Sequence, residues 1–242
     1  MAHTGIIAQA RMGSTRLPGK VLADLCGAPA LDRLVERLRR VPSHPQIIIA
    51  TSTLPGDDAL AAHAATLDGV GVWRGSESDV LSRYAEAAEH FDLDPIVRIT
   101  ADCPLMEPAV LQAVLDLFER TPGCDYADNV TVRTFPHGFD VQVVSRRALR
   151  LANAMAKDLV EREHVLPYIN SRPGEFRCVD LKSDTDNSDL RITLDYPEDL
   201  ALIRAIYEKL FPGNPEFGLD DILALRARDP QLFEINAKHI AH

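Results

Sequence analysis

Three fixed positive charges lie within ten residues near the start of the chain, in the segment from Arg11 to Lys20. Two glycines in this segment allow a close backbone approach and a positive φ, and two hydroxyl side chains add hydrogen-bond donors. Guanidinium, ammonium and free backbone N–H groups together suit a polyphosphate. The residues expected to contact it are Ala10, Arg11, Gly13, Ser14, Thr15, Arg16 and Lys20.

The obvious alternative for a glycine-rich basic loop is a Walker A loop, which has four residues between its first glycine and Gly-Lys, followed by Ser or Thr. Here five residues separate Gly13 from Gly19, and Val21 follows Lys20. Pro18 also lacks a backbone N–H. Side chains are therefore expected to carry more of the phosphate recognition than they do in a Walker A loop.

Two aspartates are predicted to follow strands of the sheet and to precede a proline that turns the chain into a helix. Asp102 follows the predicted strand Ile96–Thr100, and Asp195 follows the predicted strand Leu190–Leu194. Ligands gather outside the carboxyl ends of strands in open α/β sheets, so Asp102 and the basic loop are expected to share one rim. Carboxylates are preferred ligands of Mg²⁺. The alternative is that each aspartate only caps the next helix.

The elements that must position these residues alternate between short apolar runs and amphipathic segments, which predicts an α/β fold with a mostly parallel sheet. The predicted strands are Gly5–Ala10, Gln46–Thr51, Gly71–Trp73, Ile96–Thr100, Phe176–Leu181 and Leu190–Leu194. The predicted helices are Pro29–Arg40, Asp57–Leu67, Ser76–Phe91, Glu107–Arg120, Ser145–Ala156, Asp158–Asn170, Pro197–Leu210 and an amphipathic tail over 219–242. In the helix that follows Asp195, Glu198 and Asp199 are expected to be first-turn charges favoured by the helix dipole.

Residues 125–185 depart from simple alternation, with short extended runs and the alternating segment FDVQVV at Phe139–Val144. We expect one domain over 1–242, with 125–185 as a substrate-binding insertion. A domain of this length can bury a sizeable core.

The chain carries 36 acidic and 26 basic residues, for a formal charge of −10. This balance argues against nonspecific binding to nucleic acid or to an anionic membrane. A triphosphate would then need local positive charge and a bridging metal ion. The four cysteines form no Cys-x-x-Cys pair, which favours reduced thiols over a zinc site or a disulfide framework. No apolar run approaches the roughly 18 residues of a membrane span, so a cytoplasmic protein is expected.

The string ARMGSTRLPGKVL, from Ala10 to Leu22, resembles the N-terminal signature of the cytidylyltransferases that make CMP-activated acidic sugars. It is most similar to the SpsF-like branch, named for spore coat polysaccharide biosynthesis. RITADCPL around Asp102 and ITLDYPEDL around Asp195 resemble the two metal-binding segments of this family, in which Asp-Thr-Pro-Glu-Asp-Leu is the usual second form. Tyr196 is a departure that leaves the carboxylate untouched.

Three further segments carry the resemblance. RGSESDVLSR, from Arg74 to Arg83, resembles the segment that contributes to nucleotide recognition, which implies roles for Ser76, Asp79 and Arg83; a helix start with an exposed salt bridge is the alternative. FPHGFDVQVV and EREHVLPYI resemble substrate-binding segments of the SpsF-like branch, which implies substrate contacts for Asp140, Gln142, Glu163 and His164. Gln142 replaces an expected acid. These polar residues stand in apolar stretches, and for a lone histidine a structural role is the alternative.

The resemblance implies a Rossmann-like three-layer nucleotidyltransferase fold with a small inserted substrate or dimerisation region, and it allows a homodimer. It implies that an acceptor oxygen attacks the α-phosphorus of CTP and releases pyrophosphate. Mg²⁺ would lie on Asp102 and Asp195, with Lys20 and Arg11 acting on the phosphates. The partners would be CTP and a small sugar or acidic-sugar acceptor. A nucleotidyltransferase for another base or acceptor, and a noncatalytic nucleotide-binding protein, remain as alternatives.

Overall fold

The computed structural model describes residues 2–240. Its central element is a seven-stranded sheet. Its strand order is β5-β4-β1-β6-β8-β7-β9. The strands are β1 (His3–Gln9), β4 (Gln46–Ser52), β5 (Val70–Gly75), β6 (Leu93–Thr100), β7 (Tyr126–Asp128), β8 (Gln142–Val144) and β9 (Cys178–Asp180). The first four pair in parallel, and β8 runs antiparallel to both β6 and β7. The predicted mostly parallel α/β sheet is confirmed.

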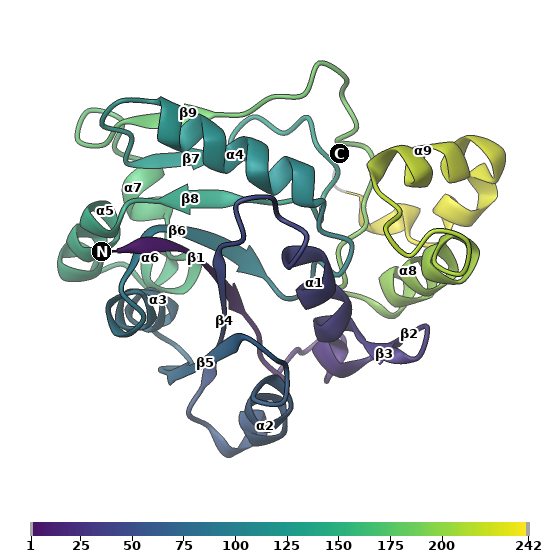
Figure 1. Ribbon diagram of the computed structural model, residues 1–242, viewed down its shortest axis with the longest axis horizontal. Coiled ribbons are helices and arrows are strands. Elements are labelled where there is room, and N and C mark those ends of the chain that lie inside the picture. Colours follow the sequence, from purple (N-terminus) through teal and green to yellow (C-terminus); the bar gives the residue numbers. More distant parts are fainter. Residues whose placement is uncertain (1, 241–242) are drawn as a thin grey trace.

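Helices cover both faces of this sheet and make three layers (Figure 1). Successive side chains of a strand point to opposite faces, so Ile6 and Ala8 of β1 belong to one hydrophobic core and Ile7 belongs to the other. The first core is completed by α1 (Ala30–Leu38), α2 (Asp58–Ala64) and α4 (Pro108–Arg120). The second is completed by α3 (Val80–His90), α5 (Arg146–Met155) and α7 (Pro167–Asn170).

The position of β1 decides where a ligand can bind. It lies between β4 and β6, so the chain leaves β1 toward one side of the sheet and β6 lies on the other side. The crevice at such a switch point opens at the carboxyl ends of the strands. The basic loop follows β1 and Asp102 follows β6, so both stand at this edge, as predicted.

The C-terminal part forms a third core beside the sheet, at the right of Figure 1. It contains α8 (Pro197–Leu210), α9 (Leu219–Arg228) and two short 3-10 helices at Pro230–Glu234 and Ala237–His239. The small hairpin of β2 (Asp24–Leu25) and β3 (Ala28–Pro29) packs against it. The predicted helical tail is therefore confirmed only in part: it is divided into α9 and two short 3-10 helices that end at His239, and residues 241–242 lie outside the described part.

The predicted strand at Leu190–Leu194 is wrong. This segment is extended, but apart from one bridge between His137 and Arg191 it makes no ladder among the described residues. The place beside β6 is taken by β8, so the apolar run pairs with the loop at His137, through His137 N–H to the Leu190 carbonyl (2.9 Å) and Ile192 N–H to the His137 carbonyl (2.8 Å). Asp195 still comes close to Asp102, because Leu194 N–H donates to the Asp102 carbonyl at 2.7 Å.

The predicted single helix at Asp158–Asn170 is also wrong. It is divided into α6 (Leu159–His164) and α7, with Val165 between them at φ 72°. Pro167 lacks the N–H that a continuous helix would need at this position, so the chain ends one helix and starts another. The strands at 126–128, 142–144 and 178–180 make residues 125–185 an extension of the same sheet.

Candidate active site

The basic loop after β1 is held in place by a buried carboxylate. Asp57 accepts a hydrogen bond from Met12 N–H at 2.7 Å, and its other oxygen accepts from Ser52 N–H and Oγ at 3.2 and 2.5 Å. Gly19 N–H donates to the Met12 carbonyl at 3.1 Å, which closes the loop on itself. Gly19 has φ 72°, a conformation that favours glycine. The expected positive φ is thus found at Gly19; Gly13 is not among the positive-φ residues.

The loop leaves backbone donors free for a ligand. Within the described part of the chain, the N–H groups of Arg11, Gly13, Thr15 and Arg16 make no hydrogen bond, whereas their neighbours in the loop do. A Cβ added to Gly13 would meet no protein atom within 4 Å, because this residue faces open space. That space is a cavity of about 280 Å³ lined by Gln9, Ala10, Arg11, Gly13, Ser14, Thr15, Arg16, Lys20, Val21, Arg83, Thr100, Ala101, Asp102 and Asp195.

Lys20 joins the two aspartates at the floor of this cavity. Its Nζ lies 3.0 Å from Oδ2 of Asp102 and 2.9 Å from Oδ1 of Asp195, and its side chain is only 10% exposed. Burial works to lower the pKa of Lys20, but the two carboxylates outweigh it and the pKa is raised. Lys20 is therefore a fixed cation at neutral pH. The two predicted aspartates converge on one point.

Two further positively charged side chains contact Asp195. Arg16 contacts its Oδ1 at 3.0 Å, and Arg191 contacts its Oδ2 at 3.0 Å. Burial of Asp195 opposes ionisation, but Lys20, Arg191 and Arg16 hold its pKa well below the usual range for an aspartate. The carboxylate thus stays ionised at any physiological pH.

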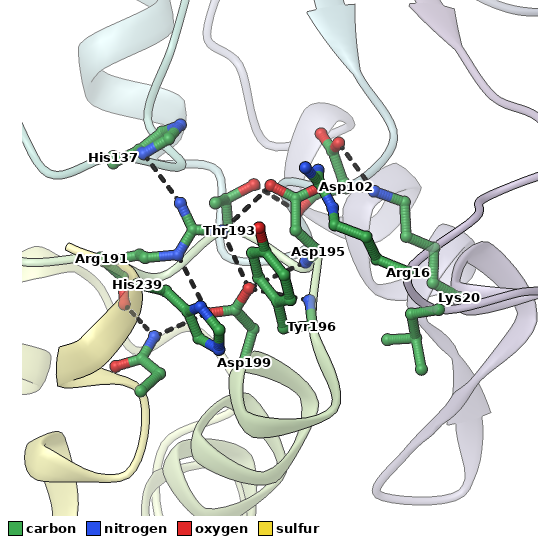
Figure 2. A network of polar contacts seen from close by, with 12 residues as sticks. Arg16, Lys20, Asp102, His137, Arg191, Thr193, Asp195, Tyr196, Asp199 and His239 are labelled. Atoms are coloured by element: carbon green, nitrogen blue, oxygen red, sulfur yellow. Dashed lines mark hydrogen bonds and ion pairs between the residues drawn. The ribbon is translucent and has the colours of Figure 1, made fainter. Parts of the chain in front are cut away.

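Arg191 is itself fixed by a buried carboxylate and by the C-terminal segment (Figure 2). Asp199, fully buried, accepts from Arg191 Nε and a terminal guanidinium nitrogen at 3.1 and 2.9 Å. The same carboxylate caps α8 by accepting from the N–H groups of Asp195 and Tyr196, both at 3.0 Å. Asn236 donates to Asp199 at 2.7 Å and to the Arg191 carbonyl at 3.1 Å. Asp199 is a first-turn residue as predicted, but its main partner is Arg191.

Tyr196 forms the outer wall of the same network. The His239 ring stacks on it with centroids 3.7 Å apart and planes 4° apart, and the Arg16 guanidinium lies 4.7 Å from the centre of the Tyr196 ring. Arg16 is thereby held between an aromatic face and the Asp195 carboxylate.

Comparison with known proteins decides the family. Residues 5–212 match the family model described as Cytidylyltransferase. The chain belongs to the cytidylyltransferase family. The protein is therefore a nucleotidyltransferase enzyme, and the predicted resemblance is confirmed.

Two relatives support the assignment along the whole chain. This cytidylyltransferase is 34% identical to the spore coat polysaccharide biosynthesis protein SpsF of Bacillus subtilis over 93% of this chain and 94% of the relative. Its structure is similar to that of a cytidylyltransferase from Leptospira borgpetersenii serovar Hardjo-bovis, with a TM-score of 0.90, 30% identity and coverage of 96% of this chain and 97% of the other. It also shares its fold with CMP:2-keto-3-deoxy-manno-octonic acid synthetase, solved in complex with CTP, at a TM-score of 0.66, 18% identity and coverage of 86% and 99%.

Of the three residues predicted in the nucleotide-recognition segment, the structure brings only Arg83 to the cavity of this cytidylyltransferase. Arg83 is buried, and it donates to the Ser76 carbonyl at 2.8 Å. Ser76 and Asp79 shape the helix start instead: Ser76 Oγ accepts from Asp79 N–H, and the Asp79 carboxylate accepts from Ser82 N–H, both at 3.0 Å. Asp79 also pairs with Arg162 of α6 at 2.5 and 2.9 Å. The capping alternative therefore describes Ser76 and Asp79 better.

The four predicted substrate residues do not line the cavity either. Asp140 forms a two-point ion pair with Arg133 at 2.7 and 3.1 Å, and Gln142 lies between Tyr126 and Arg98 at 2.7 and 2.5 Å. Glu163 and His164, expected to be polar groups within apolar surroundings, are instead exposed on α6. The expectation of apolar surroundings was wrong, because α6 is a short helix with no buried residue.

Several residues of the site escaped the sequence analysis: Asp57, Arg191, Tyr196, Asn236 and His239. Each acts through a partner distant in sequence or through a contact made by the fold; Asp57, for example, is 45 positions after Met12 in the sequence. A signal was available only for Arg191, a charged residue inside an otherwise apolar run.

The two aspartates fit a divalent cation. Both already contact one positively charged group, so their oxygens are oriented toward a shared point. Within residues 2–240 no cluster of three or more His, Cys, Asp or Glu side chains is placed to bind a metal. A metal held by two carboxylates would therefore take its remaining ligands from water and substrate, which is the usual arrangement for Mg²⁺. Separately, none of the helices described is long and apolar enough to cross a membrane.

Proposed function

We propose that this cytidylyltransferase transfers CMP from CTP to a sugar or acidic-sugar acceptor and releases pyrophosphate, in the synthesis of a polysaccharide or surface-glycan precursor. The observation that carries the proposal is the meeting of Lys20, Asp102 and Asp195 beside a basic loop with free backbone donors. The CTP bound by the octonic acid synthetase of the same fold, and the polysaccharide role in the name of the Bacillus relative, support this direction.

In this proposal the loop binds the triphosphate. The free N–H groups of residues 11, 13, 15 and 16 donate to phosphate oxygens, and Arg11 and Arg16 add charge, so the local field becomes positive in a chain of formal charge −10. Ser14 and Thr15 line the cavity and supply hydroxyl donors. Ala10 and Arg83 line the same cavity, and in this proposal they also contact the nucleotide. Phosphoryl transfer needs alignment and charge neutralisation more than covalent help from the protein.

Lys20 and Arg11 act on the phosphates during the reaction. Because the raised pKa keeps Lys20 protonated, its ammonium offers a fixed charge to the oxygens on which negative charge develops. Asp102 and Asp195 would hold Mg²⁺, which when bound neutralises charge on the triphosphate. The ring of Tyr196 and the carboxylate of Asp195 keep Arg16 oriented.

We place the acceptor next to the segment 125–185. The supporting contact is His137, whose Nδ1 lies 3.1 Å from a guanidinium nitrogen of Arg191, so this segment reaches the network around Asp195. Asp140 lies near His137, at 3.9 Å, and remains our candidate for an acceptor contact. Gln142 would support it from β8. We assign no acceptor contact to Glu163 or His164.

The test is a screen of neutral sugars and sugar acids with each nucleoside triphosphate and Mg²⁺, measuring pyrophosphate release. We expect release with CTP and one class of sugar acid or sugar, and a thermal shift by CTP that depends on Mg²⁺. Equal turnover of ATP, GTP and CTP would favour a nucleotidyltransferase of another specificity. Binding of CTP without turnover of any acceptor, including water, would favour a noncatalytic protein.

A further inference from the structure

A second cavity of about 230 Å³ lies between α1, α8 and the turn that follows α8, and it shares no lining residue with the first. Its wall is unusually basic for a chain of formal charge −10. Three arginines line it together with Tyr207, Phe211 and Glu216.

Two of the three arginines lie on one face of α1, and the third lies in the turn that follows this helix. Arg33 and Arg37 are four residues apart, which brings their side chains to the same side of the helix, and Arg40 lines the cavity from the turn. Arg33 is fully partnered: it donates to Glu36 at 2.9 Å and to the carbonyls of Leu25 and Cys26 at 2.9 and 2.6 Å. Its charge is thus satisfied within the protein.

Arg37 is different, because its guanidinium is buried and incompletely paired. The residue is 2% exposed, and in the described part of the chain neither terminal nitrogen has a hydrogen-bond partner. Among residues 2–240, the one hydrogen-bond partner of this guanidinium is the Tyr207 hydroxyl, 3.3 Å from Nε. The Phe217 ring lies 4.4 Å from the guanidinium carbon and stabilises the charge from one face, but it leaves the in-plane donors unsatisfied. A buried, unpaired charge is costly and calls for a ligand.

Arg40 adds a second charge to the cavity wall. It lines the same cavity, and none of the ion pairs formed among residues 2–240 includes it. Burial and the neighbouring Arg37 lower its pKa, whereas Glu216 and Glu107 act weakly in the opposite sense. Glu36 is engaged by Arg33, so Glu216 at the rim is the remaining carboxylate on the wall.

We propose that this cavity is a binding site for a small phosphate-type oxyanion held between Arg37 and Arg40. Planar guanidinium groups donate two parallel hydrogen bonds to such an anion, which would satisfy the terminal nitrogens of Arg37 and relieve the repulsion between the two charges. The site is separate from the triphosphate loop. Its ligand is free phosphate or a small phosphate monoester.

The experiment titrates inorganic phosphate, glycerol phosphate and, as a salt control, KCl at equal ionic strength, using calorimetry and thermal unfolding. The variants are Arg37→Met and Arg40→Gln, with Arg39→Gln as the matched control; Arg39 follows the last residue of α1, is exposed and donates to the Asp68 carbonyl outside the cavity. A Lys20→Met protein, impaired at the first cavity, separates the two sites.

We expect phosphate to raise the Tm of the wild type, the Lys20→Met protein and the Arg39→Gln protein by about 3 °C at saturating concentration. Arg37→Met and Arg40→Gln should each weaken phosphate binding at least about tenfold, since each removes one of two charged donors. In phosphate-free buffer Arg37→Met should have a Tm equal to or above the wild type, because it removes an unpaired buried charge. Tighter binding of glycerol phosphate than of phosphate would identify a monoester as the ligand.

Three results would overturn the proposal. Phosphate binding that survives both substitutions shows that the arginines are not the site. Loss of all phosphate stabilisation in Lys20→Met places the anion in the first cavity. If Arg37→Met unfolds or loses stability in phosphate-free buffer while Arg40→Gln binds phosphate normally, Arg37 is a structural residue.

Discussion

Lys20 lies where a single charge can serve both aspartates and, in the proposed complex, the phosphates. Lys20→Met keeps most of the apolar stem and removes the ammonium. If that ammonium stabilises charge in the transition state, its loss costs on the order of 3 kcal/mol of barrier, so kcat should fall by roughly a hundredfold or more. Steady-state kinetics with CTP measure this, and Lys157→Met, at an exposed position, is the matched control.

Separate measurement of kcat and KM distinguishes a catalytic role of Lys20 from a role in substrate binding alone. A variant whose KM for CTP rises while kcat is unchanged would show that Lys20 only binds substrate. Stability is a further readout, because Asp102 loses its only ion-pair partner among the described residues, whereas Asp195 keeps Arg16 and Arg191.

The two aspartates should differ in their effect on folding. Asp102→Asn and Asp195→Asn are each expected to abolish turnover, because an amide is a poorer ligand for a hard cation. Asp195→Asn should also lower the free energy of unfolding by about 2 kcal/mol, since Arg191 and Lys20 lose a charged acceptor. Asp102→Asn should lower the free energy of unfolding by a smaller amount. Circular dichroism and urea unfolding measure the difference; near-normal activity of either variant at saturating Mg²⁺ would make that aspartate a helix cap only.

At the scale of elements, the C-terminal segment supports the site from outside the matched family region, which ends at residue 212. His239 stacks on the Tyr196 ring, and the Arg16 guanidinium also contacts this ring. His239→Ala should free the Tyr196 ring and raise KM for CTP by about three- to tenfold, since loss of one aromatic stack is worth about 1 kcal/mol. The fold should persist.

Lys238→Ala is the control for this variant. Lys238 comes from the same short helix and pairs with Glu198 at 2.6 Å, as His239 does at 3.1 Å, but it is not stacked on Tyr196. An equal change in KM for both variants would mean that the segment acts through Glu198 and not through the stack.

The local sequence was sufficient to predict the site residues that lie within one short motif. The loop from Arg11 to Lys20 and Asp102 carry their own signals, because the spacing of glycine, charge and strand end is contained in a few residues. Asn236 has no such signal. Its role depends on Asp199, 37 residues away, and on the packing of the C-terminal segment against α8. Asp79 shows the opposite failure: it lies in a matching motif, yet Arg162 and the start of α3 take up its carboxylate.

At the scale of the whole molecule, the first half of the fold follows from the sequence because β1, β4 and β6 contribute buried side chains to both cores, β5 adds partly buried ones, and helices separate these strands. The pattern weakens where a strand is three residues long, as in β7, β8 and β9. The extended segment at 190–194 has the apolar character of a strand, but it is buried by the third core and the loop at His137. Several extended segments compete for a place in the sheet, so the sequence of one segment alone does not determine whether that segment joins it.

The response of the whole molecule to acid provides the last prediction. Burial raises the pKa of Asp57, but hydrogen bonds from Met12 N–H and Ser52 outweigh it and lower the pKa, and ion pairs lower that of Asp195. A carboxyl group with a pKa below its unfolded value of about 3.9 binds fewer protons when folded, so its stabilisation is complete above that pH and is lost as the pH falls further. These two carboxylates should make the Tm fall steeply below about pH 4.

Asp57→Asn tests this origin directly. The amide can still accept from Met12 N–H, but its NH₂ group cannot accept from Ser52 N–H, so the variant should have a lower Tm at pH 7. It should also lose less Tm than the wild type between pH 4 and 3, because one proton-linked group is gone. Asp58→Asn, at the exposed neighbouring position, should reproduce the wild-type slope. If Asp57→Asn and the wild type decline in parallel, the acid sensitivity comes from other carboxylates and Asp57 serves the loop through its hydrogen bonds alone.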